Sequence, residues 1–117
     1  MNIPELQEDE RYAGVILNED GTLSHHVILI SQQPTERLSW NDAMAWAEKA
    51  GGTLPTRQEQ SLLVANCKNA FAGWYWSSTQ YAGYASHAWR QIFGNGGQTI
   101  NDKGYKGRVR AVRRVPI

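Results

Sequence analysis

Cysteine is nearly absent from the 117 residues, with Cys67 as the single instance, so no disulfide can form within the chain. The fold must therefore be held by packing and hydrogen bonds alone. No apolar run approaches the length of a membrane span. The first residues also lack the basic and apolar regions of a signal peptide. These absences predict a protein that has no membrane association and remains in the cytoplasm where it is made.

Net charge is also small, at +1, which predicts no nucleic-acid partner. The charges are nevertheless unevenly placed along the chain. Six of the eleven acidic residues lie within the first twenty positions, whereas six of the twelve basic residues lie from Lys103 onward with no acidic residue among them. Two interpretations are open. The two ends are complementary neighbours in the fold, or the basic end is a free strand for an anionic ligand.

Phenylalanine is scarce too, with two residues against five tryptophans and five tyrosines. Trp and Tyr combine an apolar body with a polar tip, so they suit half-exposed binding surfaces as well as cores. The length fits one domain with a real core, and 41% apolar with 20% charged residues is a globular composition. The chain is therefore predicted to be a single domain that carries a binding surface.

The first thirty residues predict an acidic arm over 1–12 and then a β-hairpin. Apolar runs at 14–17 and 26–30 flank Asp20-Gly21, which is a strong short-range hairpin signal. The second run is continuously apolar, which indicates a strand buried on both faces. His25 and His26 are adjacent, so in a strand they point to opposite faces and do not share a metal ion. No metal and no cofactor are expected.

Two helices are predicted in the middle of the chain. Ser39 is a candidate cap for a helix that ends at Gly51-Gly52. Pro55 then forbids a helix at the residue before it, and Thr56-x-x-Glu59 forms a capping box for a second helix over 57–70. Cys67 falls on the apolar stripe of that helix, so it is interpreted as a small core residue rather than a nucleophile.

The remaining residues predict strands and turns. Alternating patterns at 74–78 and 87–93, a short run at 98–100 and a closing run at 105–115 indicate an antiparallel meander. Within the second of these strands Trp89 and Phe93 share a face, which we expect to point inward because two large rings hide more apolar area than Arg90 and Ile92. The fold class is therefore α+β.

Several of these segments together resemble a known family. The corner Leu54-Pro55-Thr56-Arg57, the strand Trp76-Ser77-Ser78 and the closing run over 109–114 are its most specific pieces. On these landmarks, residues 38–115 resemble the Lcl C-terminal-like domain-of-unknown-function family, which includes small phage and prophage members. That family is similar to a branch of the C-type-lectin fold that also holds formylglycine-generating enzymes and the variable proteins of diversity-generating retroelements. The resemblance implies one C-type-lectin-like domain over 1–117, with two helices packed on antiparallel strands and with adjacent N- and C-terminal strands.

The resemblance does not imply an activity. Formylglycine-generating enzymes bind copper with two cysteines near their C-terminus, whereas this chain has only Cys67, on the second predicted helix. Calcium lectins need a cluster of carboxylates and amides, which the sequence lacks. We therefore expect a non-catalytic protein. An enzyme with oxidase or hydrolase chemistry and a purely structural role are the other classes that the sequence leaves open.

In the retroelement proteins the ligand-binding residues lie between the Trp strand and the closing strand, which matches residues 81–105 here. Aromatic anchors beside adaptable amides are typical of binding surfaces. The alternative is that these side chains merely cover the meander. The predicted ligand-binding residues are Tyr81, Tyr84, His87, Arg90, Gln91, Asn95, Asn101 and Lys103.

The sequence thus predicts a binding module, encoded by a phage or prophage, that presents this surface to a ligand. The ligand is a host or phage protein, a glycan or a small molecule. A counter-defence inhibitor that sequesters a host factor or a nucleotide signal is the alternative function. The sequence also leaves open a receptor binder associated with the virion instead of the host cytoplasm. The sequence favours no particular oligomeric state.

Overall fold

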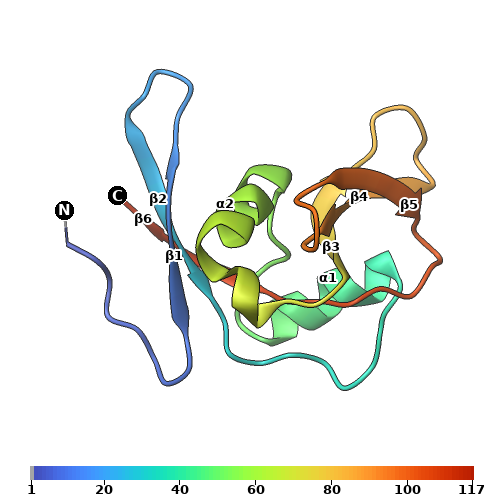
Figure 1. Cartoon of the computed structure of the whole chain (residues 1–117), viewed down its shortest axis with the longest axis horizontal. Coiled ribbons are helices and arrows are strands. Elements are labelled where there is room, and N and C mark those ends of the chain that lie inside the picture. Colours follow the sequence, from blue (N-terminus) through green and yellow to red (C-terminus); the bar gives the residue numbers. More distant parts are fainter. Residues whose placement is uncertain (1) are drawn as a thin grey trace.

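Residues 2–117 of the computed structural model form two antiparallel sheets of three strands each, together with two α-helices (Figure 1). The α+β class is thereby confirmed. Helix α2 lies between the two sheets, and the two chain ends lie on the same side of the molecule. The late strands form a sheet of their own rather than extending the sheet that holds the first hairpin.

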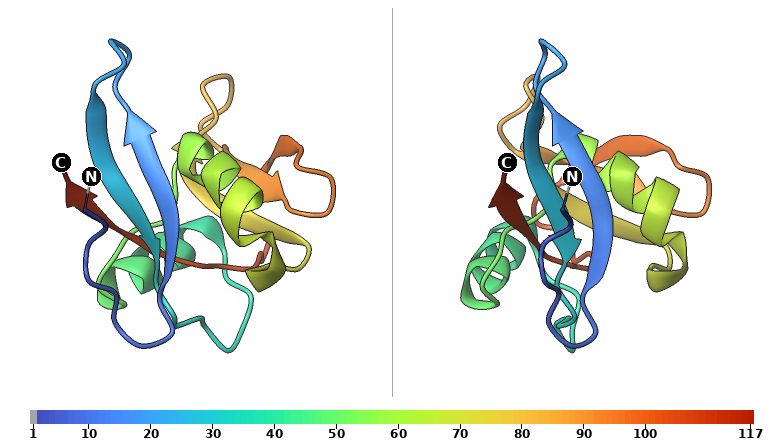
Figure 2. Two further views of the ribbon diagram at one scale, coloured as in Figure 1. Left: turned by 60° about the vertical axis from the view of Figure 1, so that its left-hand side comes forward. Right: turned by 90° about the vertical axis from the view of Figure 1, so that its left-hand side faces the viewer.

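The first sheet has the order β1-β2-β6 and joins both ends of the chain. Its strands are β1 (Arg11–Leu17), β2 (Leu23–Leu29) and β6 (Val112–Pro116). The predicted hairpin is confirmed, but the first and last strands are not direct neighbours, because β2 lies between them (Figure 2). The physical reason is the apolar character of β2, whose residues 27–29 have no exposed surface and therefore occupy the centre of the sheet.

The second sheet is the predicted meander, with the order β3-β4-β5. Its strands are β3 (Trp74–Gln80), β4 (His87–Ile92) and β5 (Gln98–Asp102). The prediction of one continuous closing strand over 105–115 is wrong. Residues 105–111 run from the second sheet to the first and make only isolated bridges, because the segment changes partners along the way.

The two predicted helices are confirmed as α1 (Trp40–Lys49) and α2 (Arg57–Cys67), the latter extended by a 3₁₀ turn over Lys68–Ala70. Gly51 ends the first helix with a φ of 90°, a conformation that favours glycine. Ser39 occupies the cap position of α1, but its side chain makes no capping hydrogen bond. The backbone carbonyl of Lys103 instead accepts a hydrogen bond from the first N–H of the helix.

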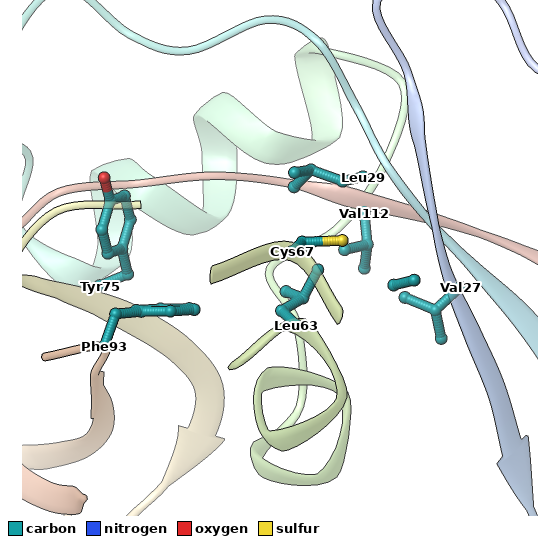
Figure 3. Close-up of a cluster of buried hydrophobic side chains, with 8 residues drawn as sticks. Val27, Leu29, Leu63, Cys67, Tyr75, Phe93 and Val112 are labelled. Carbon is teal, nitrogen blue, oxygen red and sulfur yellow. The ribbon is translucent and has the colours of Figure 1, made fainter. Parts of the chain in front are cut away.

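One of the two core clusters surrounds the inward face of α2 (Figure 3). Leu63 and Cys67 contribute from the helix, between apolar side chains of the first sheet and aromatic rings of the second. Burial raises the pKa of the Cys67 thiol, consistent with a core residue. The other buried members of this cluster are Ala13, Val27, Leu29, Tyr75, Phe93 and Val112.

The capping box at the start of α2 is confirmed and is part of a buried ionic network. The Thr56 hydroxyl accepts a hydrogen bond from the Glu59 N–H at 3.2 Å, and the Thr56 N–H donates to the Glu59 carboxylate at 2.9 Å. Both carboxylate oxygens also accept hydrogen bonds from Arg114, and one accepts from His25 at 2.8 Å. Glu59 is only 1% exposed, so a single carboxylate ties α2 to β2 and β6.

The charged ends of the chain are complementary at one point. Arg113 donates two hydrogen bonds of 2.8 Å to the Glu10 carboxylate and a third to the Glu5 carbonyl. This contact fixes the acidic arm against β6. The interpretation of the closing segment as a free basic strand is therefore wrong for Arg113 and Arg114.

We expect Thr56→Ala to lower the free energy of unfolding by about 1 kcal/mol, because the hydroxyl satisfies a free N–H at the start of α2. Ser39→Ala is the matched control, since this cap residue makes no such bond. Urea denaturation of both variants measures the difference. Equal loss in the two variants would contradict the capping role of Thr56.

We also expect stability to depend on the protonation of Glu59. Burial alone would raise the pKa of this carboxyl, but hydrogen bonds from Arg114, the Thr56 N–H and His25 outweigh burial and hold the pKa at about 2. A folded-state pKa below the ordinary value near 4.5 gives stability that is complete above that value and is lost as the pH falls toward 2. The contribution at neutral pH is about 3 kcal/mol.

Urea denaturation across this acid range should therefore show a steep loss of stability in the natural sequence and a flatter profile in Glu59→Gln. Glu48→Gln, which removes an exposed carboxylate of α1, should retain the steep profile. A Glu59→Gln profile as steep as that of the natural sequence would show that other groups cause the acid sensitivity.

Candidate ligand-binding surface

Four aromatic side chains gather where β3 ends and β4 begins, and we call Tyr81, Tyr84, His87 and Trp89 the aromatic cluster. Tyr84 lies 5.5 Å from the Tyr81 ring and 5.4 Å from the His87 ring, between ring centroids. Tyr81 meets Trp89 edge to face at 5.7 Å. Tyr84 is 60% exposed, so the cluster forms part of the surface.

The loop that carries Tyr84 is closed by its own backbone. The Tyr81 N–H donates to the His87 carbonyl at 2.9 Å, and the His87 N–H donates to the Tyr84 carbonyl at 3.1 Å. A Cβ atom at Gly83 would lie 2.5 Å from the Tyr81 ring, so glycine lets the loop fold tightly over this ring. The loop thus holds one tyrosine against the sheet and presents the other to solvent.

A fixed cation completes the surface. The guanidinium carbon of Arg57 lies 3.5 Å from the centroid of the Trp89 ring, a cation–π contact. Its Nε donates to the Gln98 side-chain carbonyl at 2.8 Å, and the Gln98 amide donates to the Arg57 carbonyl and to Gln91. Within residues 2–117 no carboxylate forms a salt bridge with Arg57. The guanidinium is therefore held flat while keeping hydrogen-bond donors for a ligand.

An open groove of about 470 Å³ lies beside this guanidinium. The start of α2 forms one wall, and residues of β3 and β5 form the other. Its side chains carry hydroxyl and amide groups, but apolar atoms make up more of its surface, so the groove offers a ligand both hydrogen bonds and apolar contact. Its lining residues are Thr56, Arg57, Gln58, Ser61, Thr79 and Gln98.

Of the residues predicted from sequence, Tyr81, Tyr84 and His87 come together in the aromatic cluster. Gln91 does not belong to an exposed surface, because it has no exposed area. Its amide donates to the carbonyls of Ile92 and Gly97 and so holds the β4–β5 turn. The alternation of β4 places this side chain on the face that α2 covers, which explains the error.

The expected orientation of β4 is correct for Phe93, which is buried, and for Arg90, which lies on the opposite face, but Trp89 is less buried than expected. Trp89 is half-exposed under Arg57 instead of buried. Arg90 points to the opposite face, away from the aromatic cluster, with its guanidinium 4.7 Å from the Trp74 ring centroid. Arg90 therefore lies on the strand face opposite His87 and Trp89 of the aromatic cluster and cannot contribute to the same ligand contact.

The other three predicted residues lie elsewhere. Asn95 is in the β4–β5 turn, where its side chain accepts a hydrogen bond from the Gly97 N–H. Asn101 pairs with Ala88 and so shares the strand face of Arg90. Lys103 donates to the Gln80 side chain and lies 4.4 Å from the Trp40 ring centroid.

Sequence reasoning missed the contribution of α2. Arg57 was visible only as the last residue of the corner that contains the Thr56 cap, and nothing local pairs it with Trp89. Gln98 and Thr79 likewise carry no motif of their own. Their proximity arises from the packing of α2 on the second sheet.

Two further features of the described chain bear on function. Among residues 2–117 there is no group of three or more His, Cys, Asp or Glu side chains arranged to hold a metal ion. The described helices are all too short or too polar to cross a bilayer.

Comparison with known proteins gives no family for the chain. No protein-family model matches the sequence, and no curated protein is significantly similar to it.

We expect substitution of an exposed predicted residue to affect stability less than substitution of a buried one. Tyr84→Ala should change the free energy of unfolding by less than about 0.5 kcal/mol, as exposed substitutions do. Gln91→Ala should cost about 1–3 kcal/mol, because it removes a buried amide that donates to two turn carbonyls and accepts from Gln98. Chemical denaturation of both variants compares them directly. A large loss in Tyr84→Ala would mean that the ring stabilises the fold rather than remaining free for a ligand.

Proposed function

We propose that this chain is a non-catalytic binding module with a C-type-lectin-like fold, encoded by a phage or prophage. Its ligand is a host or phage protein, a glycan or a small molecule, and it acts in the bacterial cytoplasm without binding nucleic acid. The observation that carries this proposal is the aromatic cluster, in which the exposed Tyr84 packs on Tyr81 and Tyr81 packs on the Trp89 ring that holds the Arg57 guanidinium.

The composition of this surface supports binding in general. Tyrosine, tryptophan and arginine dominate the energetics of known interfaces, since they offer large rigid contact areas with hydrogen-bonding ends. Here Tyr84 supplies the exposed ring, and Arg57 supplies a cation whose orientation is already set by Trp89. A surface ordered before binding loses little side-chain entropy when a ligand arrives.

The proposed lectin-like fold rests on the resemblance of residues 38–115 and is consistent with the α+β arrangement. An enzyme of the formylglycine-generating type is disfavoured by the absence of a second cysteine, since Cys67 is buried in the core. The counter-defence alternative, in which a nucleotide signal or host factor is sequestered, uses the same surface. A planar base stacks on aromatic rings, and a guanidinium binds phosphate.

Binding screens against a glycan array, a nucleotide panel and an extract of a bacterial host identify the ligand class. Each positive result is then quantified by titration with purified variants. Tyr84→Ala and Arg57→Ala should each weaken binding by about 1–4 kcal/mol, the range for interface anchors. Tyr105→Ala is the matched control, because that tyrosine is 63% exposed and makes no ring contact with the aromatic cluster.

Thermal melts of every variant establish that the fold is intact. If a well-folded double variant of Tyr84 and Arg57 retains full affinity, this surface is not the binding site. Turnover of a ligand with release of a changed product would contradict the non-catalytic assignment.

A further inference from the structure

Arg110 is a buried cation that lacks a counter-charge. It is 6% exposed, and none of the carboxylates in residues 2–117 forms a salt bridge with it. Its two terminal nitrogens donate to the carbonyls of Ala70 and Ile30, each at 3.1 Å, while its Nε has no partner. Burial without an opposite charge is costly, and here it lowers the pKa of the guanidinium.

The other arginines of the same segment differ in whether a carboxylate balances their charge. Arg113 and Arg114 are neutralised by Glu10 and Glu59. Arg108 precedes this group and forms no salt bridge among the described residues. Positive charge therefore remains uncompensated at Arg108 and Arg110, on the stretch that runs between the two sheets.

A pocket of about 260 Å³ opens on this stretch, between it and the loop over 33–37. Arg37 and Arg108 line it, and Glu36 is the one acidic residue of the lining. Tyr75 forms part of the wall, and its hydroxyl accepts a hydrogen bond from the Ala72 N–H, which leaves the hydroxyl proton to donate. The remaining lining residues are Gln33, Pro34, Thr35 and Val109.

Arg110 follows the lining residues Arg108 and Val109 in the chain and contacts the pocket wall through Phe71. Phe71 contacts the Tyr75 ring at 4.9 Å between centroids and also lies 5.4 Å from the Arg110 guanidinium. The rings of Phe71 and Tyr75 therefore connect the buried charge to the pocket wall, and electrostatic attraction is stronger in such poorly solvated surroundings than in water. An anion in the pocket would supply the counter-charge that the protein itself lacks.

We propose that this pocket binds a phosphate group, either as the free ion or as a phosphomonoester. A guanidinium donates two parallel hydrogen bonds to two oxygens of a phosphate. The two negative charges of a phosphate also balance several cations better than the single charge of a carboxylate would. Arg37 and Arg108 bind the oxygens, the Tyr75 hydroxyl donates to one of them, and Arg110 adds positive charge. The volume leaves room for part of an esterified group.

This site is distinct from the aromatic cluster. Tyr75 lies near the start of β3 and Tyr81 follows its end, so the two sites occupy opposite ends of that strand. The inference therefore does not depend on the proposed function, and either can fail alone.

Thermal unfolding with increasing inorganic phosphate, compared with chloride at equal ionic strength, tests the site. We expect a saturable rise in melting temperature with phosphate, because a ligand that binds only the folded state stabilises it. Phenyl phosphate provides the second arm. Tighter binding of this monoester indicates an esterified ligand, whereas tighter binding of inorganic phosphate indicates the free ion.

Arg108→Gln and Arg37→Gln should each raise the apparent dissociation constant for phosphate about tenfold or more, the effect of losing a charged hydrogen bond. Lys49→Gln removes an exposed positive charge from α1 and should leave binding unchanged. If Arg108→Gln does not fold, the loop variant Arg37→Gln still tests the site. Melting temperatures measured in chloride show whether each variant is folded. The proposal is overturned if phosphate stabilises no more than chloride, or if folded Arg37→Gln or Arg108→Gln binds like the natural sequence.

Discussion

The buried carboxylate of Glu59 is the contact on which the rest of the structure depends. It accepts a hydrogen bond from the free Thr56 N–H at the start of α2, and at the same time it pairs with Arg114 of β6 and His25 of β2. Removing one partner of such a pair leaves a buried charge unmatched, which typically costs about 3–5 kcal/mol. The same helix start holds Arg57, which faces the second sheet and stacks on Trp89. One turn of helix therefore joins the two sheets, with a buried ionic contact on one side and a half-buried cation on the other.

Much of the fold follows from short-range signals in the sequence. Asp20-Gly21 between apolar runs specifies the hairpin, and Thr56-x-x-Glu59 specifies where α2 begins. The order of the strands does not follow, because pairing between β2 and β6 joins residues from opposite ends of the chain. Nor does local pattern reveal that residues 105–111 leave one sheet before Val112 joins the other. The apolar run of β2 was the one indication of a central strand, since it predicted burial on both faces.

The aromatic cluster was partly predictable for a similar reason. Tyr81 and Tyr84 belong to a glycine-containing polar loop, where exposed rings are expected at a strand end. The side-chain alternation of β4 correctly separates Gln91 from Arg90, but alternation alone does not tell which face another element covers. The position of α2 decides that, and it buries Gln91 while leaving Trp89 accessible to Arg57.

The place of β6 in the first sheet has a consequence for how the protein is made. Synthesis proceeds from the N-terminus, so the hairpin and both helices leave the ribosome before residues 112–116 do. Until then β2 exposes an unpaired edge to the cell, and Glu59 lacks its arginine. Contacts between such distant residues also form slowly. The nascent chain is therefore vulnerable to proteases and to misassociation until residues 112–116 emerge and β6 completes the first sheet.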